Sequence, residues 1–395
     1  MSKQSKKLHK NIFISWILLF QWYLYFPIAI WMFYFLQYLD FREVAIIGAA
    51  STIAGSIFEI PTGAISDIIG RKKTLIISRL FGITSFVMMI LGKTFWVFLV
   101  ARFIQGISQA LWSGSLESLQ YDTLKESGQK DRFTDVVSRN GVLSWLALFV
   151  SSVVGGFLFD ISPTLPYIVT TFFTAITLII TFFIEEPKID SEVFSFSSYI
   201  KQTLKGFHEL FSTQKRRSIS LIMITITAGY FIASKILGIS QAIEYGLEGK
   251  GVGMLFGAGY LIAAFSSHFY PQIRKKLSAG KLAVLASLVL IASFLGAYFV
   301  GIFFGMVLIF LRIVSSTTFL NSKSLIINEF IDSKNRATAL STMTLLSELP
   351  FVLLSYFIGD AIDKTSPNEF ALILGIVMVG FLLPQLVRYR VIKKK

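Results

Sequence analysis

The chain has 395 residues, of which 54% are hydrophobic and only 15% charged, and its mean hydropathy is +0.68. A soluble protein carries roughly a quarter charged residues, so water is not expected to be the main solvent of this chain. The absence of cysteine excludes disulfides and thiolate chemistry, and three histidines far apart in sequence argue against a metal cluster. The net charge of +14 indicates either a nucleic-acid partner or the cytoplasmic loops of a membrane protein.

Long apolar segments follow one another along the whole chain. A membrane-spanning helix needs about 20 mostly apolar residues. The first apolar segment follows a basic stretch, but it is too long for a signal-peptide core and no cleavage site ends it, so we expect an uncleaved span. The sequence predicts twelve spans, at residues 12–39, 44–66, 74–92, 95–120, 141–160, 165–184, 218–243, 252–272, 281–300, 302–327, 337–359 and 370–388.

The basic residues test this count. If the N-terminus is cytoplasmic and the spans alternate in direction, 28 of the 37 Lys and Arg lie in inside segments, four lie outside and five lie within spans. Positive charge on the cytoplasmic side is what sets the orientation of membrane proteins. We therefore expect a multi-pass protein of the cell membrane with both termini cytoplasmic. The basic residues are dispersed over seven segments, which argues against a nucleic-acid partner.

The longest connection between spans divides them into six and six. We expect an N-terminal six-helix half at 1–187, a cytoplasmic linker at 188–217 and a C-terminal half at 218–395. The linker carries apolar residues at helical spacing, which predicts an amphipathic helix on the inner membrane surface. These apolar residues are Ile200, Leu204, Phe207 and Phe211.

Matching residues recur at a constant offset of 210 positions. Two of the pairs set an intramembrane arginine and a helix-end aspartate at corresponding points of the fourth and tenth spans, which indicates two related halves. The pairs are Gly70 with Gly280, Arg71 with Lys281, Arg102 with Arg312, and Asp122 with Asp332.

The junction of the second and third spans holds the most specific motif. Residues 63–73 read GAISDIIGRKK, which resembles the signature G-x-x-x-D-[RK]-x-G-R-[RK] of the major facilitator superfamily. The resemblance implies a conformational latch between the two halves. Ile68 stands where that family carries a basic residue, and the alternative is an ordinary basic turn that anchors a loop. The implied latch residues are Gly63, Asp67, Gly70, Arg71 and Lys72.

A polar stripe on the fourth span gives a second match. Arg102, Gln105 and Gly106 resemble the R-x-x-[QG]-G pattern of the same family. At 100° per residue Gln109 and Trp112 share the face of Arg102, and a buried arginine is so costly in lipid that this face should meet a wet cavity. In proton-coupled exporters of the family the matching arginine is associated with proton coupling. The alternative is a hydrogen-bond network that holds the helices together.

Three further charged residues within the predicted spans are candidates for the site. Arg312 on the tenth span is expected to form the opposite wall of the cavity. Glu59 is either a packed partner of Arg79 or Arg102, or a group that carries a proton. Glu348, eleven residues into the eleventh span, is the most isolated carboxylate and suits proton coupling.

The fifth span keeps only part of the family's antiporter signature, G-P-x-x-G-G. Ser151 and Ser152 replace its first Gly-Pro pair, whereas Gly155 and Gly156 remain. Because exporters commonly keep this element, its loss argues against antiport of drugs and protons, while the fold assignment is unaffected.

The resemblance implies an all-α membrane protein with twelve helices in the major facilitator fold. No enzyme motif and no phosphate-binding loop is present, so we expect no enzymatic activity, no cofactor and no metal. The hypothesis is a monomeric secondary transporter that works by alternating access and exports small lipophilic or amphipathic compounds, driven by protons. The alternatives are proton-coupled uptake of a small metabolite and a membrane sensor that transports nothing.

Overall fold

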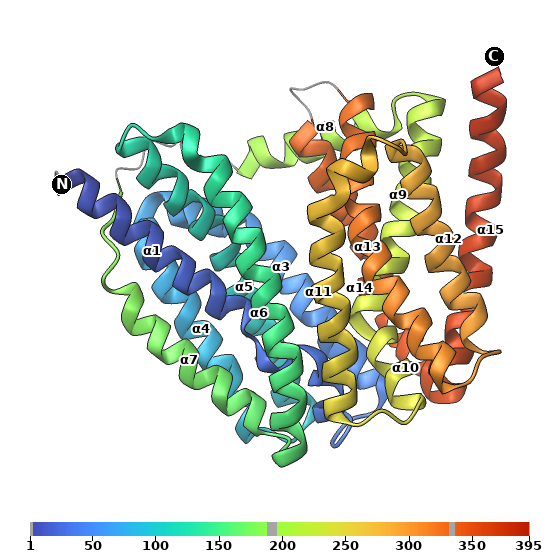
Figure 1. Cartoon of the computed structure of the whole chain (residues 1–395), viewed down its shortest axis with the longest axis horizontal. Helices are drawn as coiled ribbons and strands as arrows, with labels where there is room; N and C mark the ends of the chain where they lie inside the picture. Colours follow the sequence, from blue (N-terminus) through green and yellow to red (C-terminus); the bar gives the residue numbers. More distant parts are fainter. Residues whose placement is uncertain (1–2, 188–195, 332–335, 395) are drawn as a thin grey trace. The chain divides into compact units, whose positions relative to one another are not determined.

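The computed structural model describes residues 3–187, 196–331 and 336–394, and it is built almost wholly of helices (Figure 1). Within these described residues, eleven helical segments are long and apolar enough to cross a membrane, and Leu165–Thr181 is a shorter apolar helix. Helices suit lipid because they satisfy their own backbone hydrogen bonds. Each of the twelve predicted spans coincides with one of these segments, which confirms the predicted twelve-helix membrane fold. Asp332 lies outside the described residues.

The chain folds into two compact units. The first unit contains Met1–Leu39, Ile46–Phe196 and Gly249–Gly257. Its elements are α1 (Lys3–Tyr23), the short 3-10 helix η1 (Phe26–Ala29), α2 (Trp31–Phe35), α3 (Phe41–Ile69) from Ile46 onward, α4 (Arg71–Leu91), α5 (Phe95–Glu126), η2 (Lys130–Arg132), α6 (Phe133–Ile161), α7 (Leu165–Thr181) and the start of α11.

The second unit contains Asp40–Ala45, Ser197–Glu248 and Ala258–Lys395. A π-helical segment, η3, interrupts its first spanning helix, and such segments often occur at functional sites. The elements of this unit are α8 (Phe196–Phe211), α9 (Gln214–Ile232), η3 (Ala233–Leu237), α10 (Gly238–Glu244), most of α11 (Gly249–Arg274), α12 (Ala279–Ala297), α13 (Ile302–Phe330), α14 (Arg336–Lys364) and α15 (Pro367–Lys394).

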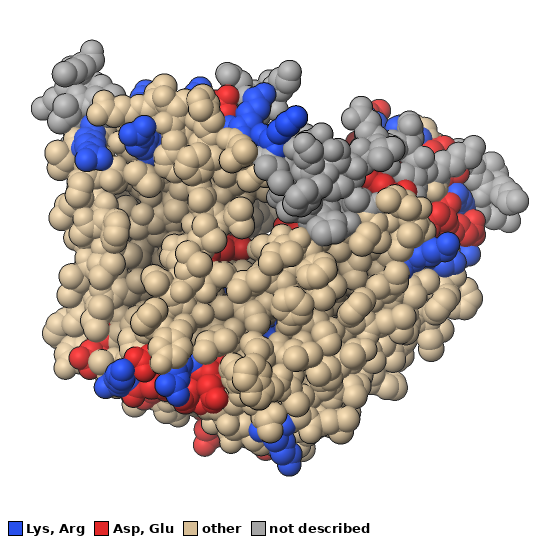
Figure 2. All heavy atoms as spheres, turned by 180° about the vertical axis from the view of Figure 1, so that it is seen from behind, with Lys and Arg blue, Asp and Glu red and all other residues tan. Residues whose placement is uncertain are grey.

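Large apolar side chains lie on the outside of these helices. Phe172 is 61% exposed, Leu353 70% and Phe381 68%. Figure 2 shows one face of the molecule, on which most Lys, Arg, Asp and Glu lie along the edges of a broad band of uncharged residues. In a soluble protein such a band would be an aggregation hazard, whereas hydrocarbon tails solvate it well.

The first predicted span is a broken helix. The sequence predicts one run over 12–39, whereas the structure has α1, η1 and α2 in succession. Pro27 explains the break, because its ring cannot continue an α-helix and its nitrogen cannot donate. The backbone of Phe26 approaches Gly155 of α6 so closely that any Cβ at residue 155 would collide with its carbonyl group. Thr170 on α7 accepts the N–H of Phe26 at 3.3 Å.

The linker contains the helix α8, over Phe196–Phe211. Leu204 is 64% exposed and Phe207 48%, while Leu210 is fully buried. The rings of Phe207 and Phe211 contact each other with centroids 4.7 Å apart. An exposed apolar face of this kind suits a helix on a membrane surface.

Candidate functional site

The turn between α3 and α4 gathers the predicted latch residues around one guanidinium. Gly70 has φ = 101°, a conformation that other residues rarely adopt, and it turns the chain into α4. The side chain of Arg71 is buried at this turn. Its guanidinium forms an ion pair with Asp67, donates to Ser66 at 3.0 Å and pairs with Asp122 at 3.1 Å. One cation therefore joins α3, α4 and α5.

The other predicted latch positions lie beside this cluster. Lys72 is half-buried at the start of α4, and Gly63 lies inside α3. Ile68, which stands where the family pattern has a basic residue, is 79% exposed. Because this side chain lies outside the buried cluster, its apolar character leaves the contacts of Arg71 intact.

Glu186 completes the cluster, and it is absent from the residues that the sequence predicts for the latch. Its Oε1 accepts the backbone N–H of Arg71 at 2.6 Å, and its Oε2 accepts that of Lys72 at 3.0 Å. A carboxylate here satisfies two N–H groups that the start of a helix leaves open, and it complements the helix dipole. One signal was available: the acidic pair Glu185 and Glu186 directly follows the sixth predicted span.

The segment that carries Glu186 is held against α1. The side chain of Asn11 donates to the carbonyl of Glu185 at 2.7 Å and accepts its N–H at 3.0 Å. Lys7 forms an ion pair with Glu126 at 2.9 Å and donates to the carbonyl of Glu186 at 3.0 Å. The end of the sixth span thus contacts the beginnings of α1 and α4, and Lys7 links the same place to the end of α5.

A buried arginine lies in the middle of α4. Arg79 is only 1% exposed. Its guanidinium donates to the side-chain carbonyl of Gln21 at 2.6 Å and to the carbonyl of Leu18 at 2.9 Å. It also lies 4.3 Å from the ring of Trp112 and 5.4 Å from that of Trp22. In the described part of the chain no carboxylate pairs with Arg79, so neutral groups alone hold this charge.

Gln21 is itself fixed by α7, which sets the position of Arg79. Its amide donates to Thr174 at 2.9 Å, and Thr177 donates to its carbonyl oxygen at 3.0 Å. Glu59, one expected partner of this arginine, is exposed on α3. The sequence suggests Arg79 only as a partner of Glu59 and gives no sign of its contact with Gln21.

Arg102 on α5 lies in an aromatic environment that the break in the first span creates. Its guanidinium donates to Gln105 at 2.6 Å and lies 5.1 Å from the ring of Trp31. Tyr25 and Tyr167 lie within electrostatic range of the Arg102 guanidinium. Their rings contact each other edge-on, with centroids 6.5 Å apart. The structure therefore brings Arg102 and Gln105 together and adds two tyrosines to them.

The two remaining residues of the predicted polar stripe, Gln109 and Trp112, lie in different environments. Gln109, one turn beyond Gln105, is exposed. Trp112 is 5% exposed and belongs to a buried hydrophobic cluster with Leu75, and its ring stacks on Trp22 with centroids 4.6 Å apart. Gln109 is therefore available at the surface of this unit, whereas Trp112 belongs to the interior around Arg79.

The second unit buries an arginine in a similar manner. Arg312 on α13 is 3% exposed, and its guanidinium donates to the side-chain carbonyl of Gln241 at 2.8 Å. The amide of Gln241 in turn donates to Asn368 at 2.9 Å. The guanidinium lies 5.2 Å from the ring of Phe294. Within the described residues Arg312, like Arg79, has a neutral amide acceptor and no carboxylate partner.

Glu348 is less isolated than the sequence suggests. It is half-buried on α14, and its carboxylate interacts electrostatically with the ammonium group of Lys323 on α13. Lys323 is 7% exposed. Two opposite charges thus lie near each other within the spanning helices of the second unit, where lipid makes each of them costly alone.

Arg79, Arg312 and Lys323 are charged side chains buried within spanning helices. Ionisable groups in such positions commonly mark a substrate or ion pathway. No group of three or more His, Asp and Glu side chains that could hold a metal occurs in 3–187, 196–331 or 336–394.

Comparison with known proteins gives a family match over most of the chain. The family model of the Major Facilitator Superfamily matches residues 12–355. An uncharacterised MFS-type transporter of Bacillus subtilis, YxaM, is 24% identical over 272 residues, which are 66% of this chain and 65% of that protein. The match thus spans just under two thirds of that relative. The class D tetracycline resistance protein of Salmonella ordonez is 26% identical over 130 residues, 33% of this chain and 32% of that protein.

Solved structures show the same fold. A crystal structure of a mutant of the nucleoside transporter NupG superposes with a TM-score of 0.78, covering 98% of this chain and all of that chain (100%), at 14% sequence identity. At that identity the likeness concerns the fold alone.

Proposed function

The chain belongs to the Major Facilitator Superfamily and is thereby a secondary transporter, and we propose that it exports small lipophilic or amphipathic compounds in exchange for protons. Members of this fold move substrate by alternating access, and the chain has no phosphate-binding loop with which to use a nucleotide. Similarity to a tetracycline resistance protein supports export.

The observation that carries proton coupling is the buried ammonium of Lys323 on α13, which lies within electrostatic range of Glu348 on α14. When Glu348 is ionised, it compensates the charge of Lys323 inside the membrane span. When it takes up a proton, that compensation ends and the ammonium is left in a costly environment. Protonation therefore alters the stability of the arrangement of α13 and α14, which is what coupling of a proton to a conformational cycle requires.

Arg102 is the second element of the proposal. Its guanidinium is held by Gln105 and Trp31 and lies near the hydroxyl-bearing Tyr25 and Tyr167. The substrate candidates on the same unit are Gln105, the exposed Gln109 and the buried Trp112, and Arg312 is the candidate on the second unit. The latch around Asp67 and Arg71 is proposed to stabilise one of the two alternating conformations.

Everted membrane vesicles test the proposal with a panel of labelled lipophilic compounds that includes tetracycline. We expect at least one compound to accumulate, an uncoupler to abolish the accumulation, and Arg102→Ala to abolish it as well. Accumulation that survives dissipation of the proton gradient would contradict proton coupling.

Uptake of a small metabolite is the second candidate, and the fifth span favours it. Ser151 and Ser152 replace the Gly-Pro pair that exporters of this family commonly carry. The hydroxyl of Ser151 donates to the carbonyl of Leu148 at 3.1 Å. Accumulation in right-side-out vesicles, with none in everted ones, would support uptake over export.

The remaining expectations are also proposals. We propose that the protein lies in the cell membrane as a monomer with both termini cytoplasmic, and that its halves are 1–187 and 218–395. The bias of 28 inside Lys and Arg to four outside supports this orientation.

A further inference from the structure

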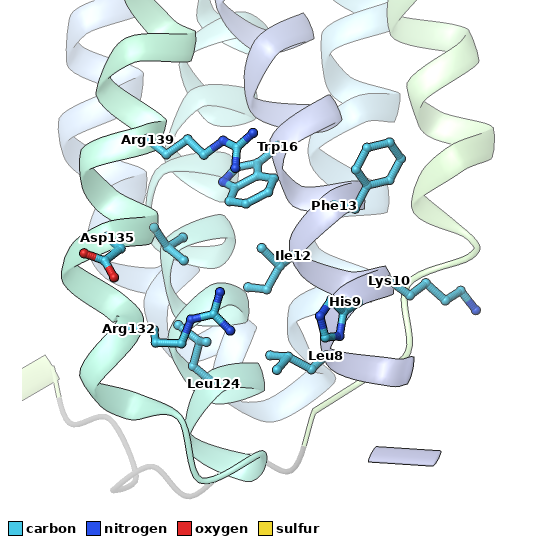
Figure 3. A pocket seen from close by; sticks show the side chains of 11 residues that line it. Leu8, His9, Lys10, Ile12, Phe13, Trp16, Leu124, Arg132, Asp135 and Arg139 are labelled. Atoms are coloured by element: carbon cyan, nitrogen blue, oxygen red, sulfur yellow. The ribbon is translucent and has the colours of Figure 1, made fainter. Parts of the chain in front are cut away.

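A cavity of about 550 Å³ opens between α1 and α6 in the first unit (Figure 3). Its floor is apolar. Leu8, Ile12, Leu124 and Val136 form a buried hydrophobic cluster there. Phe13, which is 62% exposed, also lines the cavity. An apolar floor of this kind accepts a hydrocarbon chain.

Positive charge surrounds the opening. Lys10, Arg132 and Arg139 line it, together with a single carboxylate, Asp135. Lys10 already pairs with Glu185 at 2.9 Å. Neither of the two arginines forms an ion pair in the part of the chain that the structure describes. The lining therefore holds two guanidinium groups that have no ion pair, of which Arg132 donates to the side-chain carbonyl of Gln129 at 2.7 Å.

Trp16 adds an open hydrogen-bond donor at the same place. The guanidinium of Arg139 lies 4.2 Å from its ring (Figure 3). The indole Nε1 is buried and has no hydrogen-bond partner among the described residues. Because a buried N–H is costly when it stays unpaired, this position favours a ligand that brings an acceptor oxygen.

The cavity lies at the border of the apolar segments. The spans that frame it begin at Lys7 and Lys130, so Arg132 lies at the start of one span. Arg139, seven residues further along α6, lies roughly 10 Å deeper if the helix runs across the membrane. This is the depth range of lipid headgroups and of the first part of their acyl chains.

We propose that this cavity binds an anionic phospholipid from the membrane leaflet in which α1 and α6 begin. The phosphate lies between Arg132 and Arg139 and accepts the free N–H of Trp16, and one acyl chain runs over Ile12 and Phe13. Guanidinium groups suit this role because they hold phosphate oxygens in pairs. The site is independent of the compound that the protein transports.

The test uses the purified full-length protein in detergent and counts bound lipid by native mass spectrometry. Dioleoyl phosphatidylglycerol and dioleoyl phosphatidylcholine are titrated separately, so that only the headgroup charge differs. We expect the anionic lipid to bind at least tenfold more tightly. The double variant R132Q/R139Q should lose roughly tenfold or more of that affinity, while K275Q/K276Q, which removes two exposed charges at the end of α11, should keep it.

A variant that is expected to strengthen binding distinguishes a specific effect from a general loss of structure. Asp135→Asn removes the carboxylate from the lining and should tighten the binding of phosphatidylglycerol. Equal binding of the two lipids, or a preference that R132Q/R139Q retains, would overturn the proposal. Displacement of the lipid by millimolar inorganic phosphate or by oleate alone would also overturn it, because the occupant would then be a free anion or a fatty acid.

Discussion

The guanidinium of Arg79 and the side-chain amide of Gln21 are joined by a 2.6 Å hydrogen bond in the interior of the first unit. The second unit repeats the device, with Arg312 donating to Gln241 at 2.8 Å. Both glutamines lie on the first spanning helix of their unit, and both are fixed by a further side chain. Each unit therefore keeps a positive charge in its interior with a neutral acceptor, which leaves the charge itself uncompensated.

Gln21→Leu should destabilise the protein by about 2 kcal/mol or more, because it leaves a buried guanidinium without its main acceptor. The measurement is the free energy of unfolding, or the melting temperature, of the purified protein. Gln109→Leu is the matched control, since that glutamine is exposed on α5, and it should change stability by less than about 0.5 kcal/mol. Equal losses in the two variants would contradict the role given to Gln21.

Gly155→Ala should destabilise the protein by about 1–3 kcal/mol, because the new methyl group collides with the backbone of Phe26. Gly114→Ala is the control: it has open space at its Cβ position and lies inside a helix, where alanine is favoured by up to about 1 kcal/mol. Thermal unfolding of both variants should move in opposite directions. A Gly155→Ala protein as stable as the wild type would show that the first span can break elsewhere.

Asp67→Asn should shift the balance between the two transport conformations and leave folding intact. The substitution removes one of the two carboxylates that pair with the guanidinium of Arg71, and Asp122 remains to hold it. Because the chain has no cysteine, labelling of a single Gln109→Cys by an impermeant maleimide from either side reports the balance. Asp131→Asn, an exposed carboxylate in η2, is the control and should leave the labelling rates unchanged. The latch proposal fails if Asp67→Asn leaves both rates unchanged as well.

The proposed orientation predicts which engineered cysteines an impermeant reagent reaches in intact cells. Lys93→Cys lies in a segment expected outside, and Lys276→Cys lies in one expected inside; both positions are exposed. We expect labelling of the first alone, and labelling of the second only after permeabilisation. The opposite pattern would invert the topology and require one span more or fewer.

The spans were predictable because lipid imposes a simple rule on sequence, namely long apolar runs with basic residues on one side. The ion pair between Asp67 and Arg71 was predictable because the two residues are only four positions apart, on either side of the turn at Gly70. Pro27 was also visible in the sequence, but a single proline hardly changes the hydropathy of a long apolar segment, so hydropathy alone predicted one unbroken helix.

The partners of the buried charges were not predictable, because they come from distant segments. Gln21 lies 58 residues before Arg79, and Glu186 lies 115 residues after Arg71. A helical wheel places Trp112 on the face of Arg102, yet only packing decides that Trp112 is buried against Trp22. Lys323 and Glu348 likewise come within electrostatic range of each other only through the packing of α13 and α14. Sequence periodicity gives the face of a helix, whereas the neighbour of that face depends on the whole fold.

Proton movement in reconstituted vesicles tests the central claim most directly. Vesicles with a trapped pH dye and no imposed gradient receive the compound that everted membranes accumulate, and the internal pH is followed. We predict a pH change with the wild type and with Glu329→Gln, an exposed carboxylate on α13, and none with Glu348→Gln. Glu348→Gln vesicles that move protons at the wild-type rate would contradict the account.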